Sequence, residues 1–459
     1  MTGVEPGNEK NNGVVLATFL ENHRMTPSTE FNADLYQDEI PANFRRFVDV
    51  IGDRCWLDQS ALIAADIKRN QFLQEYLTAQ NSMALALTDC SQAAAKNGNK
   101  LPQALTAQLR MLECHIFVSQ TLQLIDAATR FSKKRGESLI SRVRGAFKNP
   151  TDIQAMQLEA RVATHFLRIG ASVRFPELGS GRERFDLLVE SLGTYGLEME
   201  CKAVTHDKGR KIHRLEGLEY RHKALPMMQR HALRQTFGLA VVVTVPRRMP
   251  GMDDFAAHID GVDKQIQLGC NGTLQDGTEI TLTTFSPAAL GQLLSPMSLK
   301  NKVAVAKITG TRNREALICQ SPGATGLVIF VLQSAQPDSL LPEVFATLAD
   351  SAGRQLTGKR AGAFIGGFQG LERRALLELA LYDGENGQHS QLAREASSFL
   401  ERPEFPHVVG VGFLSAPDYT VKPDNDESKG VAYYFPKHTS PMWHPHFSGL
   451  FGNNARQET

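Results

Sequence analysis

One stretch of the chain, RERFDLLVESLGTYGLEMECKAVT at residues 182–205, constrains the fold more strongly than any other. Two short apolar runs flank a turn that contains glycine, which is the pattern of a β-hairpin. Side chains alternate along a strand, so each run turns alternate residues to opposite faces. Asp186 lies on the first run, and Glu198, Glu200 and Lys202 share one face of the second. A half-buried hairpin is therefore expected to bring carboxylates of like charge together.

A turn centred on Gly193 places Asp186 directly opposite Glu200, with Cβ atoms about 5 Å apart. Two carboxylates in that position repel each other, and a divalent cation between them reverses the sign of the interaction. Mg²⁺ suits this position because it prefers carboxylate oxygens, water and substrate phosphates, and Mn²⁺ accepts the same ligands. Lys202 then projects beside the metal, where it can steady a phosphate or an attacking water.

The elements around the hairpin predict an α/β core. The segment after Pro150 has one apolar helical face, formed by Ile153, Met156, Ala160, Ala163 and Leu167. Thr151 or Asp152 is expected to cap this helix. A strand-like run, ASVRFPE, precedes the hairpin. A basic helical stretch at 211–236 follows it, and then GLAVVVTVP, which is typical of a strand buried on both faces. The expected order is helix, three strands, helix, strand.

Asp186, then thirteen residues, then Glu200-Cys201-Lys202 resembles the motif of the PD-(D/E)XK nuclease superfamily, which has the restriction-endonuclease-like fold. The expected order of elements over about 150–246 is also similar to that fold. The resemblance implies that Asp186 and Glu200 bind the metal, that Lys202 is catalytic, and that Glu159 on the preceding helix is a further ligand. This chain departs from the pattern at Phe185, where the family name has proline.

Two basic segments flank the hairpin in sequence. Residues 131–150 contain six Lys or Arg against one Asp or Glu, and residues 202–234 contain nine against three. Such side chains can neutralise phosphates without reading sequence, although a solvated helix face gives the same pattern. The candidate nucleic-acid contacts are Lys133, Lys134, Arg135, Arg142, Arg144, Arg182, Arg184, Lys208, Arg210, Lys211 and Arg214.

The composition excludes several classes of protein. The 459 residues are 42% hydrophobic with a net charge of +1, so size and apolar content allow a large core. Six widely spaced cysteines form no CxxC pair, which argues against a zinc site and a disulfide framework. The polar start does not have the pattern of a signal peptide, and the apolar runs are too short to cross a bilayer. We expect a cytoplasmic protein with no membrane contact.

Breaks in the pattern suggest five regions. Residues 1–40 are expected to be a flexible leader, and 41–148 an all-helical domain whose long apolar stripes mediate self-association. The nuclease-like core is expected at 149–250, an additional α/β region at 251–417, and a polar tail at 418–459. Within the α/β region, GAFIGGFQG lacks the GK[ST] of a phosphate-binding loop, so its glycines are expected to serve tight packing or turns.

The expected fold is thus a mixed sheet flanked by helices, preceded by a helical domain and followed by further α/β elements. The expected function is a metal-dependent nuclease, a DNA endonuclease acting in restriction or phage defence. Two alternatives use the same residues. The carboxylates can be solvated on an exposed sheet, or the fold can serve a catalytically inactive nucleic-acid-binding or assembly protein.

Overall fold

The computed structural model describes residues 30–36, 38–98, 100–102, 105, 109–178, 183–249, 251–290, 299–311, 316–320, 326–385, 389–420 and 426–451. The chain divides into two units, and each consists of segments that are far apart in sequence. Unit 1 takes its described residues from Met1–Leu62, Gln80–Lys208 and Leu341–Thr459. Unit 2 takes them from Ile63–Ala79 and Gly209–Leu340. The chain therefore leaves unit 1 just after the predicted hairpin and returns to it more than a hundred residues later.

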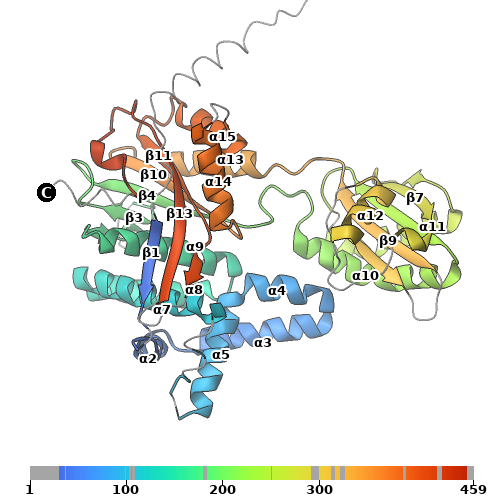
Figure 1. Cartoon of the computed structure of the whole chain (residues 1–459), viewed down its shortest axis with the longest axis horizontal. Coiled ribbons are helices and arrows are strands. Elements are labelled where there is room, and N and C mark those ends of the chain that lie inside the picture. The colour runs from blue at the N-terminus through green and yellow to red at the C-terminus, as the bar shows by residue number, and fades with distance from the viewer. Residues whose placement is uncertain are drawn as a thin grey trace, which may run out of the picture. The chain divides into compact units, whose positions relative to one another are not determined.

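Unit 1 is built on a mixed sheet with the strand order β1-β13-β11-β10-β4-β3-β2, and β12 pairs with β13 (Figure 1). The strands β4, β10 and β11 are parallel to one another, and the other neighbours are antiparallel. The strand bounds are β1 Glu30–Leu35, β2 Val173–Arg174, β3 Leu187–Val189, β4 Leu197–Val204, β10 Ala361–Phe368, β11 Val408–Leu414, β12 Asp418–Thr420 and β13 Asp426–Pro436.

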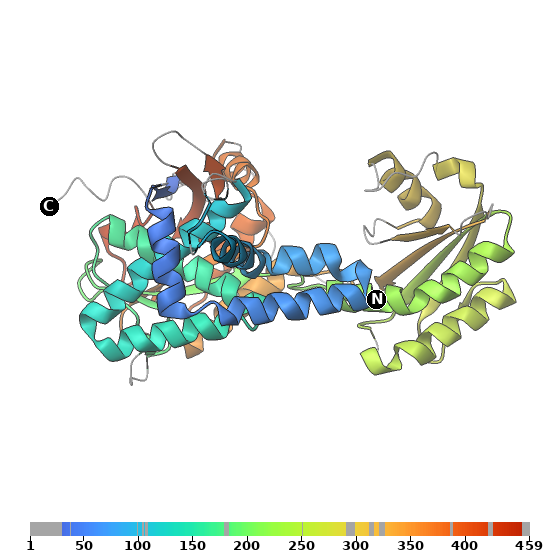
Figure 2. The ribbon, with the colours of Figure 1, turned by 90° about the horizontal axis from the view of Figure 1, so that it is seen from below.

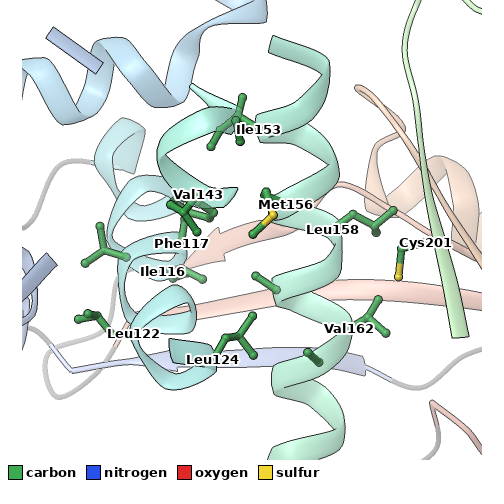
Figure 3. Packing of buried hydrophobic residues seen from close by; sticks show 14 of the residues in the cluster. Ile116, Phe117, Leu122, Leu124, Val143, Ile153, Met156, Leu158, Val162 and Cys201 are labelled. Atoms are coloured by element: carbon green, nitrogen blue, oxygen red, sulfur yellow. The ribbon is translucent and has the colours of Figure 1, made fainter. Parts of the chain in front are cut away.

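Helices cover both faces of this sheet. The first set is α2 Ile40–Ile51, α3 Arg54–Arg69, α5 Ser82–Lys96, α7 Leu109–Phe131, α8 Lys133–Ala146 and α9 Pro150–Arg168. These helices share one apolar core with the sheet residues Leu197, Met199 and Cys201. Helix α3 contributes Trp56 from its N-terminal part, and its C-terminal end belongs to unit 2. Figure 3 shows Leu158 and Val162 of α9 beside Cys201. The second set is α13 Leu340–Arg354, α14 Arg373–Glu385 and α15 Gln391–Leu400, which pack on the opposite face.

The helix before the hairpin forms as predicted. The residues Ile153, Met156, Ala160 and Ala163 of α9 are all buried. Its N-cap is Asn149, whose side chain accepts from the Thr151 backbone amide, rather than Thr151 or Asp152. Asn is as good a cap as Asp, because its side-chain oxygen satisfies one of the free amides of the first turn.

The strand beside β4 is not the predicted one. We expected the run at 238–246 to join the hairpin, but β5 Gly238–Val245 lies in the sheet of unit 2. Instead α13 leads into β10, which pairs in parallel with β4 and places Phe364 next to Glu200. Both runs are apolar enough for a buried strand, and strand pairing between distant segments is not encoded locally. The boundaries expected at 149–250 and 251–417 therefore do not match the units.

The ends of the described chain also belong to the sheet. Residues 30–35, expected in a leader, form edge strand β1, which pairs with β13. Residues 426–436, expected in a polar tail, form β13 itself, between β1 and β11. Val431, Ala432 and Tyr433 are buried there. The sequence did not predict this strand, because its short apolar run, VAYYF at 431–435, lies between polar segments.

The region expected to be an independent helical domain, 41–148, shares its core with the sheet. Phe117 of α7 and Val143 of α8 belong to the same apolar cluster as the strand residues Met199 and Ile365. These apolar stripes are buried within the chain, so they no longer argue for contact with a second copy.

Unit 2 has its own sheet, with the order β6-β7-β5-β9-β8, in which only β5 and β9 are parallel. Its strands are β5 Gly238–Val245, β6 Gly272–Thr273, β7 Glu279–Phe285, β8 Leu317–Gln320 and β9 Leu327–Ser334. Its helices include α4 Gln74–Gln80, α10 Arg214–Arg234, α11 Phe255–Leu268 and α12 Leu299–Thr309. Figure 2 shows α10 and α11 on one face of these strands and α12 on the other. The run GLAVVVTVP is therefore buried on both faces, as predicted.

Short 3-10 turns complete the described elements: η1 Gln71–Leu73, η2 Pro176–Leu178, η3 Met252–Asp254, η4 Pro287–Leu290 and η5 Pro445–Phe447. Over the described residues, every helix is too short or too polar to cross a membrane.

Candidate active site

The hairpin has the predicted register. Leu187 pairs with Met199, and Val189 pairs with Leu197. Asp186 lies one residue before this ladder, and its carboxylate accepts a hydrogen bond from the backbone amide of Cys201, the neighbour of Glu200. The chain bends at Phe185 and Asp186 before β3 begins, and Phe185 accordingly packs with Leu188 rather than with Leu187. The alternation predicted for the strand therefore holds from Leu187 onward.

Four carboxylates from four elements meet at this end of the hairpin. Glu159 comes from α9, Glu177 from η2, Asp186 from the residue just before β3 and Glu200 from β4. Carboxylate oxygens of Glu159, Glu177 and Asp186 lie within 4.8 Å of one another. Glu159, Asp186 and Glu200 are buried, and Glu177 is partly exposed. The site is therefore a largely buried cluster of acidic groups.

The hydrogen bonds of the cluster leave part of its acceptor capacity unused. The Cys201 backbone amide donates to Asp186 Oδ2 at 2.7 Å, and Lys202 Nζ donates to Glu200 Oε1 at 2.6 Å. The other Glu200 oxygen, Oε2, is buried and accepts no hydrogen bond from the described residues. A buried acceptor without a donor is costly, which makes this oxygen a natural position for a cation.

Burial and mutual repulsion raise the pKa of every carboxyl group in the cluster. Burial and then the charge of Asp186 raise the pKa of Glu200 to about 8, although Lys202 opposes the shift. The same two causes raise the pKa of Glu159 well above its ordinary value. Burial raises the pKa of Asp186 against the Cys201 amide, which lowers it. Burial therefore outweighs the two basic side chains of the cluster, Arg142 and Lys202.

Among the predicted catalytic and metal-binding residues, Lys202 is partly exposed to solvent, whereas Asp186, Glu200 and Glu159 are buried. Its side chain is 23% exposed, whereas that of Glu200 is 1% exposed. The Nζ atom also donates to Gln355 Oε1 at 2.8 Å. Gln355 follows α13, so the connection from α13 to β10 helps to hold the ammonium group. Sequence reasoning did not identify Gln355, because it lies 153 positions away.

Glu198, the third acidic residue of the hairpin, lies outside the cluster. It accepts hydrogen bonds from the backbone amide of Thr357 at 2.7 Å and from Arg360 at 3.2 Å. Its charge therefore fastens the segment before β10 to β4.

The glycines of GAFIGGFQG serve close packing, as predicted, since a Cβ on Gly362 would lie 2.6 Å from the Leu356 side chain and one on Gly366 would lie 2.9 Å from Phe413.

Arg142 is in a different place from the one predicted. We expected it on a nucleic-acid path, but it reaches from α8 into the carboxylate cluster. One of its Nη atoms lies 2.7 Å from Glu159 Oε1, and the other contacts Glu177. Arg144, also expected on that path, donates to the carbonyl oxygens of Val50 and Ile51, at 2.8 and 2.6 Å. It therefore caps the C-terminal end of α2.

The other basic candidates have more peripheral positions. Lys133 and Lys134 are exposed on α8, and Arg135 lies over the Phe131 ring. Lys208 donates to Thr347, Lys211 contacts Ser339, and Arg214 pairs with Glu75. Arg210 is partly exposed, Arg184 is exposed, and Arg182 lies outside the described residues. Contact of these side chains with nucleic acid stays a prediction.

Sequence reasoning missed two groups that the fold brings together. Glu177 joins the cluster from a short turn, and a lone glutamate after Phe175-Pro176 gave no sign of this. Cys90, Cys114 and His115 meet in the core between α5 and α7, with donor atoms within 4.8 Å of one another. The spacing of the cysteines did not suggest such a group. Structural zinc sites take four ligands, so these three side chains are one short of that set.

Comparisons with protein-family models, with curated proteins and with solved structures gave no match. The function is therefore argued from the geometry of the carboxylate cluster.

Proposed function

We propose that this protein is a metal-dependent nuclease that hydrolyses phosphodiester bonds. The observation that carries the proposal is the meeting of Asp186, Glu200 and Lys202 at one end of the hairpin, with Glu159 from α9 beside them. Two carboxylates can hold a divalent cation that activates water and polarises a phosphodiester, and a neighbouring ammonium group can stabilise the charge that develops. Mg²⁺ is the proposed ion, and Mn²⁺ is expected to substitute for it.

The donor set fits a hard divalent cation. All candidate ligands are carboxylates, which Mg²⁺ prefers, and Glu200 Oε2 is buried without a donor. Burial and then the charge of Asp186 raise the pKa of Glu200 to about 8, and a bound cation would favour the charged form of this group. Asp186 and Glu200 would hold the ion, and Glu159 is the further ligand that the superfamily resemblance implies. A bound ion would polarise the phosphate and lower the pKa of a coordinated water.

The chain's own residues account for the remaining needs of the reaction. Lys202 Nζ is held by Glu200 and Gln355, so its position is set before substrate arrives. Its partial exposure lets the third N–H point to a phosphate oxygen, where negative charge develops during attack. The Cys201 amide fixes Asp186. Burial raises the pKa of the Cys201 thiol well above its ordinary value, so this thiol stays neutral beside the carboxylates.

The arrangement of elements supports a restriction-endonuclease-like core. Helix α9 is followed by the antiparallel strands β2, β3 and β4, and then, after the residues of unit 2, by α13 and β10. Strand β10 is parallel to β4. In this proposal unit 2 is an insertion between the motif strand and the next helix of the core. DNA as substrate, and a role in restriction or phage defence, rest on analogy with that superfamily.

One observation favours a second candidate, a catalytically inactive nucleic-acid-binding or assembly protein. Arg142 already pairs with Glu159 and Glu177 and Lys202 pairs with Glu200, so three of the four carboxylates have a cationic partner without any metal. A fold that has lost its reaction can keep such pairs to stay stable.

Cleavage assays separate the two candidates. The purified full-length protein would be incubated with supercoiled plasmid, linear duplex DNA and RNA, in Mg²⁺, in Mn²⁺ and in EDTA. A nuclease cleaves at least one substrate with the metal and none in EDTA. Lys202→Ala should slow cleavage by roughly 10²–10³-fold, as removal of a transition-state donor does. Lys359→Ala, an exposed lysine beside the same connection, is the matched control. No cleavage of any substrate, or equal rates for Lys202→Ala and wild type, would reject the nuclease.

A further inference from the structure

Arg142 is the least expected member of the site. Its side chain is 30% exposed, and its two Nη atoms reach two different carboxylates, Glu159 and Glu177, rather than gripping one in a bidentate pair. Burial lowers the pKa of Arg142, but the charges of Glu159, Glu177 and Asp186 outweigh burial and raise it. A guanidinium is in any case always charged in proteins. A fixed positive charge therefore stands between two carboxylates of the cluster.

The charges of the site can be counted among the described residues. The cluster holds four carboxylates, Glu159, Glu177, Asp186 and Glu200, and two basic side chains, Arg142 and Lys202. When all are ionised, two negative charges remain, and one divalent cation balances them. Sites that bind two metal ions for phosphoryl chemistry use the second ion to neutralise further oxygens. In this cluster the Arg142 side chain already neutralises two of the carboxylates, Glu159 and Glu177.

We propose that Arg142 takes the place of a second cation, so that the site binds a single divalent ion at Asp186 and Glu200. Arg142 is then a positioning residue: it neutralises Glu159 and Glu177 and keeps them from drawing a second ion. The inference rests on the proposed metal site, and it revises the role expected for Glu159. Arg142 pairs with Glu159 and Glu177, whereas Glu200 accepts from Lys202 and keeps its buried Oε2 oxygen without a hydrogen bond from the described residues.

An alternative role for Arg142 is purely structural, as an ion pair that joins α8 to α9 and η2. Such a pair would affect stability but not the number of ions bound. The number of ions per chain is therefore the readout that separates the two roles, and it does not depend on catalysis.

The test counts Mn²⁺ ions per chain by isothermal titration calorimetry, with the free ion measured by electron paramagnetic resonance, on full-length protein without nucleic acid. Wild type is expected to bind one ion. Arg142→Gln exposes Glu159 and Glu177 and is expected to bind two. The double variant Arg142→Gln with Glu177→Gln restores the wild-type charge balance and is expected to bind one. Arg142→Lys keeps the charge and is also expected to bind one.

Several results would overturn the inference. Two ions on wild type would do so whether or not any variant folds. One ion on a folded Arg142→Gln variant, with folding checked by circular dichroism, would also do so. No ion on wild type would reject the metal site itself, and the inference with it. One ion on wild type and two on Arg142→Gln, but no cleavage of any substrate, would reject the nuclease and leave the inference standing.

Discussion

The acidic pairs of unit 2 and the carboxylate cluster of unit 1 differ in the direction of their pKa shifts. In unit 2, Glu219 of α10 accepts hydrogen bonds from Arg69 at 2.7 and 3.2 Å. Burial alone would raise the pKa of Glu219, but the bonds from Arg69 outweigh it and the pKa is lowered. Asp263 of α11 behaves in the same way, because His231 and Arg230 donate to it at 2.6 and 2.8 Å. In the unit 1 cluster every carboxyl pKa is raised.

The difference separates structural charges from functional ones. A carboxylate that a cation already satisfies stabilises the folded protein and has little capacity left for a ligand. A carboxylate with a raised pKa is held in an environment that disfavours its charge, and such groups gather at functional sites. The pairs of unit 2 therefore join helices, whereas the cluster of unit 1 has the negative charge that the proposed metal site needs.

Cleavage should show the largest contrast between the two units. Asp186→Asn and Glu200→Gln should each lower the cleavage rate by roughly 10²-fold or more, because the metal and the developing charge lose a partner. Asp263→Asn in unit 2 should leave the rate close to wild type. Rates would be measured under single-turnover conditions in Mg²⁺. An equal loss from Asp263→Asn would mean that the two kinds of carboxylate are not distinct in function.

The pH dependence of stability should have opposite signs in the two units. The pKa of Glu200 is raised from 4.5 to about 8, so between these values the unfolded chain releases a proton that the folded protein keeps. Stability in EDTA therefore falls as pH rises through this window, by up to about 1.4 kcal/mol per pH unit for one group. Asp263, with a lowered pKa, gives stability that is lost as pH falls.

Urea unfolding in EDTA between pH 5 and pH 8 would measure this dependence. Glu200→Gln should flatten the decline, whereas Asp263→Asn should leave it unchanged. A wild-type stability that rises across the same range would contradict the shifts assigned to the cluster.

Neutral substitutions at a single pH should also separate the units. Glu219→Gln breaks a pair with a half-exposed arginine and should cost about 1 kcal/mol. Glu200→Gln relieves repulsion with Asp186 and should be no less stable than wild type in EDTA. Thermal unfolding at pH 7.5 would compare the two. If Glu200→Gln is the more destabilising of them, the charge of Glu200 is structural.

The smallest effect is expected at the exposed start of α8. Lys133, Lys134 and Arg135 remain candidates for phosphate contact, whereas Arg142 and Arg144 have structural partners. Reversing the three charges should weaken binding to all sequences alike. Each lost contact should lower the log–log salt slope by roughly 0.9 on duplex DNA and about 0.7 on a single strand. Fluorescence anisotropy across a salt series would measure the slope. The same slope in the triple variant and in wild type would show that this surface is only solvated.

Local pattern predicted the hairpin well. Alternation in YGLEMECKAV and the glycine-containing turn were enough to predict the register that pairs Leu187 with Met199 and Val189 with Leu197. The apolar face of α9 was equally predictable, because helical spacing depends on neighbours three and four residues apart. These features depend on residues that are close in sequence, so they could be argued without a fold.

Features that depend on distant residues could not be predicted in this way. The runs GLAVVVTVP and AGAFIGGF are both apolar and equally suited to a buried strand, yet only the second pairs with β4. Parallel pairing joins segments far apart in the chain, and here 132 residues of unit 2 intervene. The hidden strand β13 was missed for a related reason, since its place in the sheet depends on β1 and β11.

The sequence by itself therefore determined the register of the hairpin, which brings Asp186 near Glu200 and Lys202, and the helix that carries Glu159. Only the tertiary structure decided that Glu177 completes the cluster, that Gln355 holds Lys202, and that Arg142 points inward rather than to solvent. The physical reason is that the residue type alone gives the charge of a side chain, whereas the packing of distant segments determines which groups lie next to it. A basic run shows how many charges a helix carries, and the fold decides which of them is buried.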